Sequence, residues 1–412
     1  MDDIIGAGLR EPETAIGYET NRRVREAAGG RAVLTSGSKV ELLGFARAGH
    51  AQATLVAGLP HEVLTNWEGP LEGLVDGAAN ARFEVLYGGH RLEVVAMQWM
   101  TAWKPEHRTW VLADDEAVAR AFLTEVSRWS AEVHDEVLVF QDGCFSKSTR
   151  LHEDLRRASW EDLVLRGAEK DEIARDFERF FASKEAYARA ACPWRRGALF
   201  MGPPGNGKTH CVKALVKRLG KPTIYVRGFR HRYRTTADCI SEVFERARRL
   251  APCVLVLEDL DGLFDPEGLA FFLNELDGFG ENSGLVTLGT TNHPERLDPA
   301  LLDRPSRFDR TYAFELPHAE DRRRFLVVQN AKLADLGALS AATIDELVDA
   351  THEFSFAYLK ELVMGALVAV VGGAAHDTES AARAIVPRLR EQLGRAREIA
   401  ARPIKPAKSD DD

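Results

Sequence analysis

The sequence predicts an α/β domain with a parallel sheet, preceded by a mixed α+β region and followed by a small helical domain. From Ser159 onward, short apolar runs alternate with segments of helical periodicity, which is typical of a parallel sheet covered by helices. A glycine-rich segment separates the first apolar run from the first helical one. Past Pro317 the apolar residues recur only at helical spacing, so the last part of the chain is expected to contain helices alone.

The α/β domain is expected over residues 156–316 and the helical domain over 317–401. Strands are predicted at five apolar runs: 198–201, 223–226, 253–257, 285–290 and 311–315. Helices of the last domain are predicted at 322–333, 342–350, 356–371 and 379–401. The polar residues 402–412 have too little apolar surface to pack and are expected to form a disordered tail.

Residues 1–155 form the predicted α+β N-terminal domain. Apolar and polar side chains alternate over 83–87, and Gly88-Gly89 can adopt the positive φ angles of a tight turn, so a hairpin is expected there. Asp114 or Asp115 can cap a helix that follows. This region contains no motif with recognisable chemistry, and we therefore expect it to recognise a partner or substrate.

Length and charge limit the class of protein. A chain of 412 residues is long enough for two or three domains, and a net charge of −9 argues against a protein that coats nucleic acid. The five cysteines are scattered without any C-x-x-C spacing, so neither a disulfide framework nor a zinc knuckle is expected. The longest apolar run, 362–375, is shorter than the roughly 20 residues that cross a bilayer. A cytoplasmic protein that does not contact membranes is expected.

The segment Gly202-Pro203-Pro204-Gly205-Asn206-Gly207-Lys208-Thr209 fits the pattern G-x-x-x-x-G-K-[ST] at every fixed position, and His210 follows it. Its glycines let backbone N–H groups point at phosphate oxygens, while Lys208 neutralises the β and γ oxygens and the Thr209 hydroxyl holds Mg²⁺. A glycine-rich turn that matches by chance is disfavoured, because an apolar run precedes the segment and a helical pattern follows. Residues 202–210 are therefore the predicted binding site for a nucleoside triphosphate.

Two acids follow the apolar run at 253–257. Glu258 and Asp259 stand at the end of this predicted strand, about fifty residues after the phosphate-binding segment. Phosphoryl transfer requires mainly position and charge neutralisation, which a metal-facing and a water-facing carboxylate provide. We expect one acid to lie near Mg²⁺ and the other near the attacking water. The alternative is an ordinary acidic strand end, which is less expected after a phosphate-binding segment.

Two more motifs lie downstream. Gly289-Thr290-Thr291-Asn292 ends an apolar run, and LDPALL at 297–302 is followed by RPSRFDR at 304–310. Together with 202–209 and 254–261, these motifs occur in an order that resembles the AAA family of ATPases. The resemblance covers residues 159–401, and the lead-in WEDLVL, with RRG just before the glycine-rich segment, is similar to the Bcs-type and Cdc48-like branches.

The resemblance implies a P-loop AAA module with a C-terminal helical lid that hydrolyses ATP with Mg²⁺. It identifies Asn292 as the sensor of the γ-phosphate and Arg307 and Arg310 as arginine fingers, which in this family complete the site of the adjacent subunit. A permanently charged, planar guanidinium suits charge that develops in a transition state. Self-association into a ring, with a hexamer as the expected form, and ATP-driven remodelling or unfolding of a protein partner are thus implied.

The chain departs from the family pattern in three places. The acids stand as Glu258-Asp259, whereas the family usually has Asp then Glu, so the metal-facing side chain is one methylene longer and the water-facing one shorter. Asp303 and Ser306 alter the arginine motif. Phe356 and Tyr358 replace small residues in the lid motif, although Ser355, Ala357 and Leu359 still match.

The basic loop at 227–234 aligns with the segment that carries the pore loop in the family. Tyr233 lies near the family's pore aromatic, flanked by Arg232 and Arg234, and these three residues are expected to grip an extended polypeptide. Arginine with an interleaved aromatic also suits a phosphate backbone and stacked bases, so a nucleic acid is a second possible ligand. A solvated basic loop without a ligand is the third interpretation.

Two other functions fit the same motifs. One is a nucleotide-gated switch or scaffold, in which the reversed acids bind ATP but hardly hydrolyse it. The other is a nucleic-acid loader, which the overall acidity disfavours. A fused zinc protease is not expected, because His61-Glu62, His152-Glu153 and His352-Glu353 lack a second histidine at the H-E-x-x-H spacing.

Overall fold

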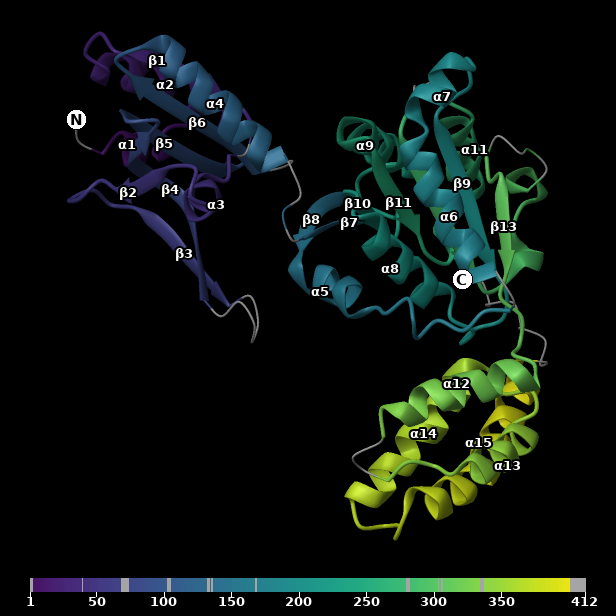
Figure 1. Cartoon of the computed structure of the whole chain (residues 1–412). Coiled ribbons are helices and arrows are strands. Elements are labelled where there is room, and N and C mark those ends of the chain that lie inside the picture. Colours follow the sequence, from purple (N-terminus) through teal and green to yellow (C-terminus); the bar gives the residue numbers. More distant parts are fainter. Residues whose placement is uncertain are drawn as a thin grey trace, which may run out of the picture. The chain divides into compact units, whose positions relative to one another are not determined.

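The computed structural model describes residues 3–38, 40–67, 74–101, 105–131, 134, 136–166, 169–278, 282–302, 304, 307–333 and 337–400 (Figure 1). The chain divides into two compact units, Met1–Val133 and His134–Asp412. The predicted tail at 402–412 lies outside the described residues, as do Asp303 and Ser306.

The first unit is an antiparallel sheet with helices. Its six strands run in the order β1-β6-β5-β4-β2, and β3 pairs with the beginning of β4. The elements are α1 (Ile4–Leu9), α2 (Ile16–Ala27), β1 (Ala32–Ser36), α3 (Leu42–Arg47), β2 (Gln52–Leu55), β3 (Glu62–Trp67), β4 (Leu74–Tyr87), β5 (His90–Met100), β6 (Pro105–Ala113) and α4 (Glu116–Ala131).

This sheet has a hydrophobic core on each face, because successive strand side chains point to opposite sides. Val94 packs with Phe45 of α3 and Phe122 of α4, whereas its neighbour Val95 packs with Val24 of α2. The predicted hairpin is confirmed, since β4 and β5 pair with Tyr87 opposite His90. The helix predicted after Asp114 or Asp115 is also confirmed as α4.

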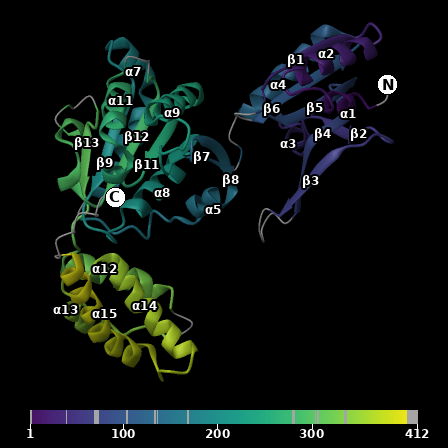
Figure 2. The same cartoon turned by 180° about the vertical axis from the view of Figure 1, so that it is seen from behind.

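The second unit contains a seven-stranded sheet in the order β13-β9-β12-β11-β10-β7-β8 (Figure 2). All neighbouring strands are parallel except β7 and β8. The strands are β7 (Val137–Gln141), β8 (Cys144–Ser148), β9 (Arg195–Met201), β10 (Thr223–Val226), β11 (Cys253–Leu257), β12 (Leu285–Thr291) and β13 (Arg310–Ala313). The five predicted strands are confirmed, and continuous apolar runs mark them because the sheet is covered on both faces.

The expected boundary between the first two domains differs from the observed division. The sequence predicts that residues 134–155 belong to the N-terminal domain. In the structure, however, β7 pairs in parallel with β10, with Leu138 opposite Ile224. Leu151 and Leu155 of α5 (Thr149–Arg157) join the core of the second unit. The pairing partner of β7 lies more than eighty residues away in the chain, so local composition does not reveal it.

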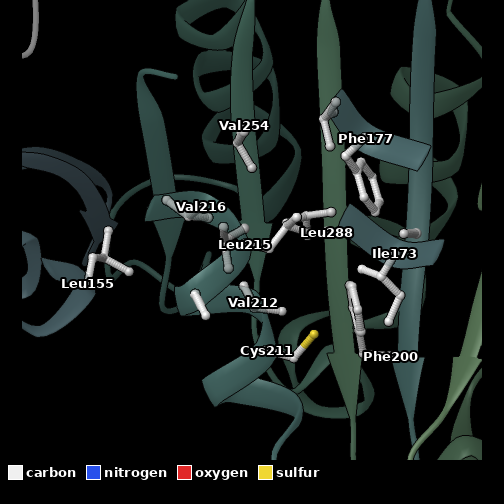
Figure 3. Packing of buried hydrophobic residues seen from close by; sticks show 14 of the residues in the cluster. Leu155, Ile173, Phe177, Phe200, Cys211, Val212, Leu215, Val216, Val254 and Leu288 are labelled. Atoms are coloured by element: carbon white, nitrogen blue, oxygen red, sulfur yellow. The ribbon is translucent and has the colours of Figure 1, made fainter. Parts of the chain in front are cut away.

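Helices of the second unit pack against this sheet. They are α6 (Glu169–Ala182), α7 (Lys184–Arg189), α8 (Lys208–Leu219), α9 (Thr236–Leu250), α10 (Leu260–Leu263) and α11 (Pro266–Asp277), with two 3₁₀ turns at Pro294–Arg296 and Pro299–Leu301. Figure 3 shows Val212 and Leu215 of α8 and Phe177 of α6 close to Val254 and Leu288 of the sheet. This core fixes the start of α8, where the phosphate-binding segment ends.

The predicted helical domain is present after Pro317. It contains α12 (Ala319–Ala331), α13 (Ala341–Ala350), α14 (Phe356–Val371) and α15 (Thr378–Ala400), which share one hydrophobic core. Among the described residues, no helix is long and apolar enough to cross a membrane. The cytoplasmic location expected from the sequence stays a prediction.

Candidate active site

The phosphate-binding segment joins the end of β9 to the start of α8, as its motif requires. Gly202 has a φ of 140°, and a Cβ there would lie 2.2 Å from the carbonyl oxygen of Phe314. Gly205 has a φ of 80°, and a Cβ there would lie 2.8 Å from the Ala357 side chain and from the Ser355 hydroxyl. Only glycine fits both positions, which lets the loop pass close to Phe314 and to the start of α14 before α8 begins.

Lys208 begins α8 and turns back over the loop. Its ammonium group donates hydrogen bonds to the carbonyl oxygens of Gly202 at 2.6 Å and Pro203 at 3.0 Å. Burial lowers the pKa of this ammonium group, and the negative charges of Asp259 and Asp261 partly oppose that shift. The cation is therefore held where phosphate oxygens would approach the loop.

A cavity of about 130 Å³ lies beside the same loop. Apolar residues of its walls include Val164, Leu165, Phe314 and Phe356, and polar or charged ones are Arg166, Glu169, Asn206, Glu315 and Asp321. The side-chain oxygen of Asn206 is buried and has no hydrogen-bond partner among the described residues. The walls are therefore partly apolar and partly charged, and they suit a ligand that has both apolar and polar surface.

Glu258 follows β11 directly. One of its carboxylate oxygens, Oε2, accepts a hydrogen bond from the hydroxyl of Tyr225 on β10. The other, Oε1, is buried without a hydrogen-bond partner among the described residues. Burial, and then the bond to Glu258, raise the pKa of the Tyr225 hydroxyl, which stays a donor at neutral pH.

These oxygens fit a magnesium ion. Mg²⁺ takes oxygen ligands and usually keeps several waters, so one carboxylate oxygen and one hydroxyl are enough protein ligands beside bound phosphates. Glu258 supplies an unpaired carboxylate oxygen, and Thr209 presents an exposed side chain in the first turn of α8. The described part of the chain contains no group of three or more His, Cys, Asp or Glu side chains that could hold a metal ion by themselves.

Asp259 and Asn292 are brought together by neighbouring strands. Parallel β11 and β12 end at the same edge of the sheet, and the Asn292 amide donates to Asp259 Oδ1 at 3.0 Å. Asp259 has a φ of 51°, a left-handed conformation that non-glycine residues seldom adopt, and its N–H bonds the Thr290 hydroxyl at 3.2 Å. The exposed carboxylate and the half-buried amide can together orient one small ligand such as a water molecule.

The helical domain contacts the phosphate-binding loop through the start of α14. The N–H of Ala357 donates to the carbonyl oxygen of Gly205 at 2.9 Å, and the Ser355 side chain caps the helix by accepting from the Tyr358 N–H. The match of Ser355 and Ala357 to the lid motif thus has a structural counterpart. A backbone hydrogen bond thus links the loop to the start of this helix.

Arg307 is held inside its own chain. Its side chain is 7% exposed and forms two parallel hydrogen bonds to Asp277 of α11, at 3.1 and 2.7 Å. A Cβ on Gly197 would lie 2.0 Å from the Arg307 carbonyl oxygen, which places Arg307 near the start of β9. The phosphate-binding loop follows the opposite end of that strand.

Arg310 also lies away from the loop of its own chain. It stands opposite Ala198 in the sheet, three residues or roughly 10 Å before the end of β9. Its guanidinium donates to Asp176 of α6 at 2.9 Å, and this hydrogen bond raises the pKa of Arg310. The structure therefore does not bring either predicted arginine finger to the phosphate-binding loop of the same chain.

His210 and Arg322 have structural contacts. The His210 ring lies 2.8 Å from the carbonyl oxygen of Ser159, so it holds the segment between α5 and α6. Arg322, at the start of the helical domain, is buried and donates to the carbonyl oxygens of Pro317 and Val348. Its position is explained by packing of the helical domain.

The basic loop has an anchored base and an exposed tip. Phe229 is fully buried, with its ring 6.0 Å from that of Phe140 on β7. Arg234 donates to the Gly143 carbonyl at 2.7 Å and pairs with Glu242, so it supports the loop. Tyr233 is 80% exposed, and the Arg232 guanidinium lies 5.5 Å from its ring. Contact of Tyr233 and Arg232 with a ligand stays a prediction.

Three residues of this arrangement were missed by sequence reasoning: Tyr225, Asp277 and Asp176. Tyr225 gives a faint signal, since it is the only hydroxyl-bearing aromatic in the run 223–226 and stands opposite Val256, two residues before Glu258. The two aspartates give none, because each is separated from its arginine by 30 or more residues.

Part of the chain is similar to known proteins. Residues 198–316 match the model of the ATPase family associated with various cellular activities (AAA). ATP-dependent zinc metalloprotease FtsH of Acidothermus cellulolyticus is 36% identical over 227 residues, covering 50% of this chain and 33% of that protein. The protein of the same name from Pirellula staleyi is 35% identical, covering 42% and 27%, and that from Ruminiclostridium cellulolyticum is 30% identical, covering 53% and 37%. The chain spans about a third of the length of these relatives.

Proposed function

Because this chain belongs to the AAA family of ATPases, we propose that it hydrolyses ATP with Mg²⁺ and uses the reaction to remodel or unfold a protein partner. The observation that carries the proposal is the group formed by Lys208, Glu258, Asp259 and Asn292 at one edge of the sheet. Position and charge neutralisation are the main requirements of phosphoryl transfer, and this edge provides both.

Each residue has a distinct task. The loop N–H groups and Lys208 would bind the phosphates, and Thr209 and Glu258 would hold Mg²⁺, which would supply charge neutralisation. Asp259 orients the attacking water and accepts its proton, with Asn292 fixing the carboxylate through the 3.0 Å hydrogen bond. The cavity lined by Val164, Leu165 and Phe356 receives the base.

Loss of the γ-phosphate changes what Asn292 and the loop contact. The loop is bonded to α14 through Gly205 and Ala357, so the helical domain responds to the state of the nucleotide. Rigid-body movement of one packed body against another is a common way to transmit such a change. We propose that this movement does the mechanical work.

Self-association into a ring is part of the proposal. Arg307 and Arg310 lie too far along β9 and β13 to serve their own phosphate-binding loop, which favours a role at the site of an adjacent copy. In addition, Met364, Val368 and Val371 of α14 are 44%, 65% and 71% exposed and recur at helical spacing. A second copy of the chain is a suitable cover for this apolar stripe.

The proposed substrate is a polypeptide. Similar proteins are named ATP-dependent proteases, which is in line with ATP-driven action on protein chains. The exposed Tyr233 with Arg232 stacked on it offers one aromatic and one cationic contact per copy. We assign recruitment of the partner to the first unit, and a capture experiment with Asp259→Asn, which stalls the ATP-bound form, should identify that partner.

A second candidate function is a nucleotide-gated switch with weak hydrolysis. The reversed acids favour it, because Asp259 is one methylene shorter than the residue usual at the water-facing position. Steady-state phosphate release by the purified full chain separates the two functions. Release that depends on ATP and Mg²⁺, and that Lys208→Ala abolishes, supports the ATPase. Tight ATP binding without release above background supports the switch.

A further inference from the structure

The reversed acids raise a geometric problem at the metal-facing position. A glutamate there has one more rotatable bond than an aspartate, so its carboxylate can occupy more positions at the end of β11. A metal site needs its ligand oxygen fixed, since ligands usually depend on a second group that orients them. Some other contact must therefore restrain Glu258.

The restraint is visible on the neighbouring strand. Parallel pairing places Tyr225 opposite Val256, so its ring lies beside the chain leading to Glu258. Tyr225 ends its side chain in a hydroxyl that donates to Glu258 Oε2. Oε1 is left buried with no partner among the described residues, although buried carboxylate oxygens are normally satisfied. One oxygen is thus held while the other is available.

We propose that Tyr225 is a positioning residue for the magnesium site: its hydroxyl holds Glu258 Oε2 and thereby directs Oε1 to the metal ion. The inference rests on the proposed nucleotide site and deepens it. Tyr225 and Glu258 together do what a shorter aspartate does alone at this position. A purely structural hydrogen bond would stabilise the strand ends but would leave the metal dependence of nucleotide binding unchanged.

The test uses Tyr225→Phe in the full chain, which removes the hydroxyl and keeps the ring. Binding of a non-hydrolysable ATP analogue is measured by calorimetry over a series of free Mg²⁺ concentrations and again in EDTA. We expect the Mg²⁺ concentration for half-maximal enhancement to rise about tenfold, the lower end of the effect of removing a group that orients a metal ligand. Binding in EDTA should stay within about twofold of wild type, because the phosphate loop is intact.

Tyr87→Phe is the matched control. The Tyr87 hydroxyl also donates to a carboxylate, that of Glu125, but it belongs to the first unit. Its removal should leave the Mg²⁺ dependence unchanged. Equal Mg²⁺ dependence for wild type, Tyr225→Phe and Tyr87→Phe would overturn the proposal.

A double-mutant cycle distinguishes loss of the Tyr225–Glu258 hydrogen bond from a general loss of structure. Glu258→Asp shortens the acid so that it no longer reaches Tyr225, and the further change Tyr225→Phe should then alter the Mg²⁺ dependence less than twofold. Full additivity of the two changes would contradict the proposal. The readout of this test is nucleotide binding. If the wild-type chain releases no phosphate, the proposed ATPase function is refuted, whereas the role of Tyr225 is still decided by the Mg²⁺ dependence of binding.

Discussion

Two groups of polar and charged residues in the second unit differ in whether their hydrogen-bonding atoms have partners within the chain. At the edge of the sheet beside the phosphate-binding loop, the buried oxygens of Asn206 and Glu258 lack partners among the described residues, and the half-buried Asn292 contacts only the exposed Asp259 among the interactions described above. In the segment that carries the two predicted arginine fingers, here called the arginine segment, Arg307 and Arg310 donate hydrogen bonds to Asp277 and Asp176 of the same chain. The first group is prepared to receive a ligand. The second has to exchange an internal partner for an external one before it can act on another copy.

The largest effect is expected at the phosphate loop. Lys208→Ala removes the cation that lies over Gly202 and Pro203, so ATP binding and phosphate release should fall to background. Calorimetry with ATP and a phosphate-release assay measure the two effects. Lys213→Ala, on the same helix α8 but outside the loop, is the control and should bind ATP like wild type. If Lys208→Ala still binds ATP, the residues beside the phosphate-binding loop are not the ligand-binding group, and the contrast with the arginines is wrong.

Arg307→Ala should preserve ATP binding but lower phosphate release by about 10³-fold, in the range found for arginine fingers supplied by a neighbour. The buried pair with Asp277 is also lost, so melting temperatures have to be compared. Arg304→Ala is a useful control, since Arg304 pairs with the same carboxylate from an exposed position. If Arg307→Ala turns over ATP at the wild-type rate, the arginine acts only in folding.

Asp259→Asn should retain ATP binding and reduce phosphate release by about 100-fold, because the amide that replaces the carboxylate cannot accept a proton from water. Single-turnover measurements with ATP distinguish slow chemistry from slow release of products. A variant that loses binding as well would place Asp259 among the nucleotide ligands and would contradict the separate tasks given to it and Glu258.

The smallest effect is expected from the apolar stripe of α14. Val368→Asp puts a charge in the middle of the stripe and should weaken self-association by about tenfold or more, since burial of a valine contributes roughly 1.5 kcal/mol. Sedimentation velocity over a range of protein concentrations measures it. Val327→Asp, at a 50% exposed position on α12, tests whether the effect belongs to α14. If Val368→Asp sediments like wild type, the apolar stripe of α14 is not part of the proposed interface.

The sequence predicts the loop edge far better than the arginine segment. The strand ends that carry Glu258 and Asn292 follow continuous apolar runs, and parallel pairing brings such ends together without any further information. The partner of Arg307 is different. Asp277 lies 30 residues earlier on a helix, and no local pattern joins the two. Tyr225 was missed for the same reason, because its role depends on register between strands.

The hairpin β7–β8 has a practical consequence for dividing the chain. A truncated protein that begins at residue 156, as composition suggests, would lose β7 and expose the paired edge of β10, an open strand edge of the kind that promotes aggregation. It would also remove Phe140, against which Phe229 packs at the base of the basic loop. A truncated protein that begins at His134 keeps the sheet whole. It is therefore the one in which ATP hydrolysis without the first unit should be measured.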